Sequence, residues 1–460
     1  FFPFSNLSSV HRLILKSRTL HMAAHDHEDK AEQQNQHDHH NEDHHDHHDH
    51  ASSGSPSGIR GSGNFIIAGL TSGHGVFHWF MQSFIVLLPE VESTFNLSKV
   101  GVGSISTTRE MVSGLITLPG GIIADVLRKY WGLILALCMA GFGVGWLIVG
   151  QAPVFPILLF GVAIVAAAAS LWHLPAMASL SHHYSHRRGT ALSFHGIGGN
   201  IGDAISPVAT GFLLAYLAWQ EILSIYAVVP IFIAFLVYWA FKNIGRARDS
   251  NSEESHPNQN RMGQTREILK NPLIWVITFA GGIRGMAFIA LITFLPSYFS
   301  NDLGLTDLRR GIYFGLLVAV GIVFTPLMGY LSDRFGRKIV LVPGMIFLAV
   351  VVLLMANFGE GVPLVILLIL LGTFFYSDQP ILTASALDIV GSGVATTTLG
   401  ALSFARFVLS ATSPIIAGYL YDTYSMNTVF YYVAALMILA AVVLAFTKLK
   451  APERTAGHHH

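Results

Sequence analysis

Long apolar stretches follow one another along the chain from about residue 64 to residue 450. Each is close to the roughly 20 residues that an α-helix needs to cross a bilayer, and many contain Gly and Pro, which are common in membrane helices. The pattern therefore predicts twelve membrane-spanning helices. They cover residues 65–90, 99–125, 129–149, 153–180, 188–217, 219–241, 272–300, 308–332, 338–357, 362–388, 395–421 and 427–448.

Polar segments divide and flank this series. Residues 242–271 carry six Lys/Arg and separate an N-terminal half (64–241) from a C-terminal half (272–450), each with six predicted helices. Residues 1–63 include a His/Asp tract with ten His and nine Asp/Glu. This tract has little apolar surface to offset the entropy of ordering, so we expect it to be disordered. Residues 451–460 form a short C-terminal tail.

Composition supports a membrane protein. Of the 460 residues, 52% are apolar and only 12% are charged, whereas about a quarter of a soluble protein is charged. The net charge of zero argues against a nucleic-acid partner. The single Cys138 excludes an intrachain disulfide. The sequence shows neither a nucleophile triad nor a Walker loop, so we expect no enzymatic activity and no cofactor.

The basic residues of the predicted loops indicate an orientation. If the N-terminus is cytoplasmic, the cytoplasmic connections hold thirteen Lys/Arg and the external ones hold three. Because Lys and Arg concentrate in cytoplasmic loops, we expect both termini and the central loop to be cytoplasmic, most simply in the inner (plasma) membrane.

Two pairs of similar segments indicate an internal duplication. Gly121-Ile-Ile-Ala-Asp125-Val-Leu-Arg128 follows the second predicted helix, and Gly329-Tyr-Leu-Ser-Asp333-Arg334 follows the eighth, with the Asp residues 208 positions apart. The run Ala-Leu-Ser-Phe opens both the fifth and the eleventh helix, at an offset of 210. Two pairs at nearly the same offset favour two related halves.

With these halves and the motif Gly-x-x-x-Asp-Arg-x-Gly-Arg-Lys after the eighth helix, residues 64–450 resemble the major facilitator superfamily. The resemblance implies an all-α membrane protein with twelve transmembrane helices in two pseudo-symmetric six-helix halves. It also implies alternating access to a midplane site and gating loops that stabilise one access state through an Asp–Arg latch. The gating-loop residues are Gly121, Asp125, Arg128, Gly329, Asp333, Arg334, Gly336, Arg337 and Lys338.

A narrower resemblance lies in the first half. Ser72-Gly-His74, Trp172-His173-Leu-Pro175 and the glycine run from Gly196 to Gly202 resemble the fosmidomycin-resistance branch. This resemblance implies export of a small anionic or drug-like compound. The glycine run lies in an apolar helix and does not follow a strand, which favours close helix packing over nucleotide binding.

Charged residues inside predicted spans are candidates for function, because a charge at the bilayer centre costs about 2.5–3.5 kcal/mol. Arg109, Arg284 and Arg406 come from three different spans. An anionic substrate group would supply their counter-charge; alternatively, each Arg pairs with an acid and locks two helices together. Glu110 and Asp203 are acidic candidates for proton coupling.

Histidines add a second chemistry. His74 and His78 share one helix face with Met81, and His173 and Met177 are four residues apart. His with Met suits late transition metals, but the same histidines could carry protons or bind substrate, since His titrates near neutral pH. His195, eight residues before Asp203, is a third candidate for proton coupling.

Three functions are open at this point. The first is a proton-coupled exporter of a small organic anion, which binds near His74, His78, Arg109, Arg284 and Arg406. The second is a transporter of a transition metal or its chelate, and the third is a metal-binding membrane sensor that does not transport. We expect a monomer in the bilayer that uses protons as coupling ion, with a divalent metal as a further partner of the His-rich tail.

Overall fold

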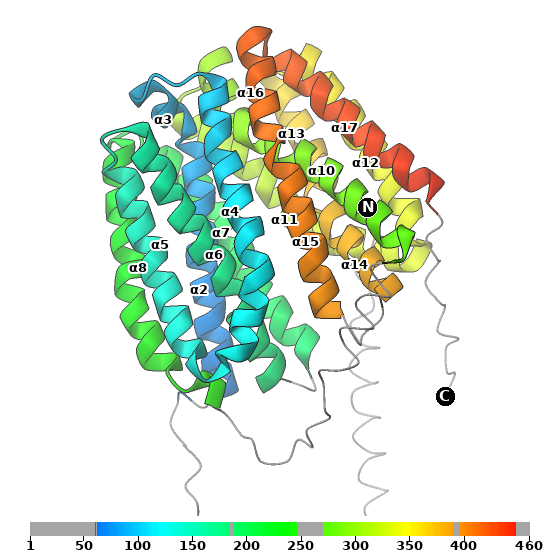
Figure 1. Cartoon of the computed structure of the whole chain (residues 1–460). Coiled ribbons are helices and arrows are strands. Elements are labelled where there is room, and N and C mark those ends of the chain that lie inside the picture. Colours follow the sequence, from blue (N-terminus) through cyan, green and yellow to red (C-terminus); the bar gives the residue numbers. More distant parts are fainter. Residues whose placement is uncertain (1–59, 61, 185–186, 247–269, 391–394, 448–460) are drawn as a thin grey trace, which may run out of the picture. The chain divides into compact units, whose positions relative to one another are not determined.

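The computed structural model describes residue 60 and residues 62–184, 187–246, 270–390 and 395–447. The chain divides into two units, Phe1–Ser55 and Pro56–His460, and every described residue lies in the second (Figure 1). The predicted disordered tract, most of the central loop and the C-terminal tail lie outside the described residues.

Helices occupy almost all of the described part of the first half. The long ones agree with the six predicted spans, and α3 is a short helix that follows α2. Their bounds are α2 Gly63–Val86, α3 Leu88–Thr94, α4 Lys99–Val126, α5 Trp131–Gly150, α6 Phe155–His183, α7 Arg188–Leu213 and α8 Trp219–Phe241, with 3-10 turns η2 Arg128–Tyr130 and η3 Ile244–Arg246.

The second half also follows the predicted spans, with two breaks that the apolar pattern did not predict. The tenth span is divided at Tyr376–Ser377 and the eleventh at Thr412. Proline cannot donate a backbone hydrogen bond, and Pro380 and Pro414 lie in the first turns after these breaks. The bounds are α10 Pro272–Ser297, the π-helical turn η4 Tyr298–Asp302, α11 Asp307–Phe335, α12 Arg337–Phe358, α13 Gly361–Phe375, α14 Asp378–Val390, α15 Ala395–Ala411, α16 Ser413–Thr423 and α17 Met426–Phe446.

Among the described residues, eight segments are long and apolar enough to cross a membrane by a strict test of length and hydropathy. The predicted spans outside this set correspond to α2, α4, α7 and the α15–α16 pair. These are the helices that carry most of the candidate polar residues, so polarity within the helices lowers their hydropathy.

The two halves share one packing pattern. In the first half α5 packs on α8 and α6, and α2 packs on α7; in the second half α12 packs on α17 and α13, and α10 packs on α15. The halves meet where α7 contacts α11 and where α4 contacts α15 and α16. By their order in each half, α4 corresponds to α11 and α7 corresponds to the α15–α16 pair. The two junctions therefore use the same two positions of each half.

Candidate functional site

A central cavity lies between the two halves. One part, of about 440 Å³, is lined by α2, α4, α6 and α7 of the first half and by residues of the second half. An adjoining part, of about 360 Å³, lies mostly against α10 and α15. The two parts form one central cavity, because they share five lining residues: Arg109, Glu110, Phe288, Tyr376 and Phe407.

The structure brings the three predicted arginines to this cavity, with different partners. Arg109 makes an ion pair at 3.3 Å with its neighbour Glu110. Arg284 is buried and pairs with the buried Asp378 at 2.6 Å, so it joins α10 to α14, the helix-locking role that the sequence left open. Within the described part of the chain, no carboxylate lies within ion-pair distance of Arg406, whose guanidinium stacks on Phe407 at 4.6 Å.

The predicted histidines gather in one cluster where α2, α6 and α7 meet. The His74 ring stacks on that of His195 at 4.1 Å, and its Nε2 lies 3.1 Å from Nε2 of His173. His78 Nδ1 lies 2.9 Å from a carboxylate oxygen of Asp203. Residues that the sequence assigned to substrate binding, metal binding and proton coupling, with His74 and His78 in both of the first two groups, are therefore neighbours.

Glycines on α7 allow this cluster to form. Gly198 and Gly202 lie against the backbone of α2, and a Cβ at Gly199 would stand 2.8 Å from Cε1 of His74. The glycine run therefore serves close helix contact, as the sequence predicted. The methionines are less central: Met81 lines the cavity, whereas Met177 is 46% exposed.

The second gating loop contains the predicted latch and one further partner. Arg337 pairs with Asp333 one turn earlier, and its Nε lies 3.1 Å from Asp388 of α14. Gly336 adopts φ 105°, a conformation that favours glycine, and Lys338 donates to the carbonyl of Thr447. Arg334 lies over Phe335. In the first loop, η2 holds Arg128 beside Trp131, and the Asp125 side chain lies outside the described part of the structure.

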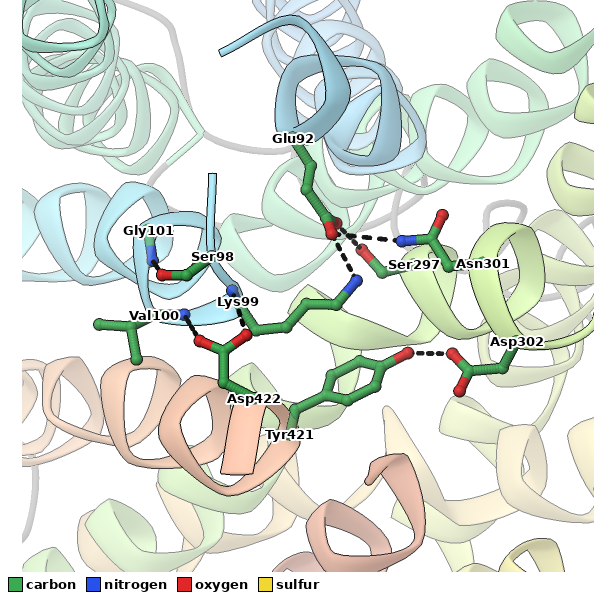
Figure 2. Close-up of polar contacts among 10 residues, drawn as sticks. All are labelled: Glu92, Ser98, Lys99, Val100, Gly101, Ser297, Asn301, Asp302, Tyr421 and Asp422. Atoms are coloured by element: carbon green, nitrogen blue, oxygen red, sulfur yellow. Dashed lines mark hydrogen bonds and ion pairs between the residues drawn. The ribbon is translucent and has the colours of Figure 1, made fainter. Parts of the chain in front are cut away.

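At the opposite end of the bundle, a polar network joins the two halves (Figure 2). Asp422 of α16 accepts hydrogen bonds from the backbone N–H groups of Lys99 and Val100, at 2.8 and 3.0 Å, and so caps α4 of the other half. Glu92 accepts from the ammonium of Lys99, and also from Ser297 and Asn301 of the second half. We call this network the polar gate.

A second ion pair joins the two halves at the same end. The fully buried Arg310 of α11 contacts Glu90 of α3 at 2.7 Å. At the gating-loop end, by contrast, a Cβ at Gly121 or Gly329 would meet none of the described residues within 4 Å. Sequence reasoning missed these gate residues and counted several of them only as loop charges. Charges of both signs at the ends of predicted spans were the sequence feature that could have revealed the gate.

A family model supports the assignment that this architecture suggests. The model described as Major Facilitator Superfamily matches residues 70–326 and 311–459, so the chain belongs to this family. It is therefore an integral multi-pass membrane protein of a family of secondary transporters.

Curated relatives cover anion carriers and drug exporters. The chain is 28% identical to the glycerol-3-phosphate transporter of Bacillus subtilis over 59% of its own length and 66% of that protein. It is 30% identical to the multidrug resistance protein MdtG of Proteus mirabilis, over 38% of its own length and 44% of that protein. The matches thus span less than two thirds of these two relatives. A probable sulfoacetate transporter of Cupriavidus necator is 25% identical over 73% of this chain and 78% of that protein.

Solved structures show the same fold. A bacterial homologue of the human lysosomal transporter Spinster, in an inward-facing and unoccupied conformation, matches with a TM-score of 0.68 at 16% identity, over 84% of this chain and 96% of that one. The nucleoside transporter NupG matches with a TM-score of 0.64 at 15% identity, over 83% and 97%.

Proposed function

We propose that this chain is a proton-coupled exporter of a small organic anion. The observation that carries the proposal is Arg406, a cavity residue with no carboxylate in ion-pair distance among the described residues. Arg109 lines the same cavity from the opposite half. An anion bound between them would contact both halves, which is the arrangement that alternating access requires.

The relatives support an anionic group on the substrate. Glycerol 3-phosphate and sulfoacetate, named for two of them, each combine a tetrahedral oxyanion with a short carbon skeleton. Arginine matches such groups with two parallel hydrogen bonds. Export is supported by the similarity to MdtG and to the efflux pump PmrA of Streptococcus pneumoniae, and by the resemblance of the first half to the fosmidomycin-resistance branch.

Proton coupling is assigned to Glu110, Asp203 and His195. Glu110 and Asp203 line the cavity and each faces a basic partner, Arg109 and His78 respectively. A proton that binds either carboxylate weakens its ion pair and frees the partner. Proton binding and substrate binding thereby become linked at one place in the cavity.

The orientation follows the loop charges. We assign both termini to the cytoplasm, so the polar gate faces outward and the cavity is accessible from the cytoplasmic side. The protein acts as a monomer in the plasma membrane.

The test is transport in proteoliposomes under an imposed pH gradient. The panel holds glycerol 3-phosphate, sulfoacetate, an alkyl phosphonate and Zn²⁺ alone. We expect one oxyanion to move against the direction of proton flow and Arg406→Ala to abolish this flux. The control is Arg309→Ala, which removes an exposed arginine of α11 outside the cavity.

Two outcomes contradict the proposal. Zn²⁺ flux with no anion flux would support metal transport instead. Anion flux that survives Arg406→Ala at the wild-type rate would remove the residue on which the proposal rests.

A further inference from the structure

The histidine cluster has a hydrogen-bond pattern that settles which ring nitrogens carry hydrogen. Nδ1 of His74 lies 2.8 Å from the carbonyl oxygen of His195, and Nδ1 of His173 lies 2.6 Å from that of Ala169. A carbonyl oxygen can only accept, so each Nδ1 must donate. In a neutral ring, Nε2 is then the unprotonated nitrogen with a free lone pair.

These two lone pairs face each other. Nε2 of His74 and Nε2 of His173 are 3.1 Å apart, and His74 is buried beside the central cavity. Two acceptors at this distance repel unless a positively charged species lies between them. The species is either one extra proton or a metal ion.

A third ring completes a ligand set. One ring nitrogen from each of His74, His78 and His173 lies within 4.8 Å of the other two. Nitrogens bound tetrahedrally to Zn²⁺ at about 2.0–2.1 Å are roughly 3.3 Å apart, close to the separation of the two facing nitrogens. Asp203 on Nδ1 of His78 is the carboxylate partner that orients metal-bound histidines in proteins.

We propose that His74, His78 and His173 bind one divalent transition-metal ion in the wall of the central cavity. Imidazole ligands suit zinc and other late first-row transition metals such as copper and nickel. Because His78 and His173 line the cavity, a fourth position faces it, as in sites that bind a further ligand. This site keeps the three histidines of the set predicted from sequence and leaves out its two methionines, Met81 and Met177. The proposal does not rest on the transported substrate.

The test measures Zn²⁺ binding to the purified full chain after chelator treatment, with no organic anion present. The His-rich tract and His458–His460 also offer imidazole groups to a metal, so the readout is a difference between variants. We expect equilibrium dialysis to find one tightly bound ion fewer in His173→Ala than in wild type. His183→Ala, on the same helix but outside the cluster, should bind as wild type does.

Two further measurements guard against a misfolded variant. Asp203→Asn keeps all three ligands and should weaken binding of that one ion by about 10–100-fold. Zn²⁺ should raise the melting temperature of wild type and His183→Ala but not of His173→Ala, because only the folded chain holds the three rings together. Equal stoichiometry and equal melting shifts in all these proteins would overturn the proposal and leave a shared proton between the rings.

Discussion

Arg284 and Arg406 both line the central cavity, but we assign them different roles because their partners differ. Arg284 neutralises Asp378, and both side chains are almost fully buried. Removing one member of such a pair leaves an uncompensated buried charge. Arg406 has no comparable partner, which is why we assign substrate binding to it and a structural role to Arg284.

The first prediction separates these roles by stability. Arg284→Ala should destabilise the protein by about 3–5 kcal/mol, whereas the double variant Arg284→Leu with Asp378→Leu should recover most of the loss. Thermal unfolding in detergent measures both. A single variant as stable as wild type would show that Asp378 is not charged when paired.

The second prediction concerns the glycine beneath the histidine cluster. A Cβ at Gly199 would stand 2.8 Å from His74 and 3.1 Å from His78, so Gly199→Ala should cost about 1–3 kcal/mol through overpacking. Gly196 is the matched control, because a Cβ there meets no atom of the described part of the chain within 4 Å. Gly196→Ala should stabilise slightly through helix propensity. Equal melting temperatures for the two variants would contradict the packing argument.

At the scale of elements, the polar gate joins helix ends rather than helix faces. Asp422 supplies a carboxylate to the N-terminus of α4 in the other half, where it satisfies free N–H groups and meets the positive end of the helix dipole. Opening at this end would break this cap and also separate α4 from α16, which pack on each other.

The third prediction is that Asp422→Ala shifts the protein toward opening at this end. Loss of a charged cap is worth about 1–2 kcal/mol, or roughly a five- to thirtyfold change in population. Spin labels at Ser93→Cys and Tyr424→Cys, both exposed, should report a larger share of long distances.

The control for this experiment is Glu221→Ala, which removes a carboxylate that caps α8 within one half. It should leave the distance distribution unchanged. An unchanged distribution in Asp422→Ala would mean that this contact does not hold the gate.

At the scale of the whole molecule, duplication explains the position of the cavity. Equivalent helices pack alike in both halves, and the halves meet through α7–α11 and α4–α15/α16. Polar residues are tolerated on these helices because they face the cavity and one another instead of lipid.

The fourth prediction concerns orientation in the membrane. With Cys138 buried, an impermeant maleimide should label Tyr424→Cys in intact cells. Lys242→Cys, exposed after α8, should react only after permeabilisation. The reverse pattern would show that the termini face outward and that the loop-charge argument fails for this chain.

The helices were predictable because each span must bury its apolar residues in lipid and satisfy its own backbone. The breaks at Tyr376–Ser377 and Thr412 were not, since proline is tolerated within membrane helices and Pro380 and Pro414 therefore do not mark a break by themselves. Candidate residues such as Arg284 and His195 could be identified because placing a polar or charged side chain within the bilayer costs free energy. Their partners could not, because helix spacing describes one helix and says nothing of its neighbours.

The sequence by itself determined the spans, the two halves, the family resemblance and the membrane-embedded charges, because these depend on local hydropathy and on repeated motifs. Only the tertiary structure decided that Arg284 is paired while Arg406 has no such partner, that four histidines from three helices meet, and that Asp422 caps a helix more than 300 residues earlier in the chain. These contacts depend on rotations and separations of packed helices, which glycines such as Gly199 permit but which no single segment encodes.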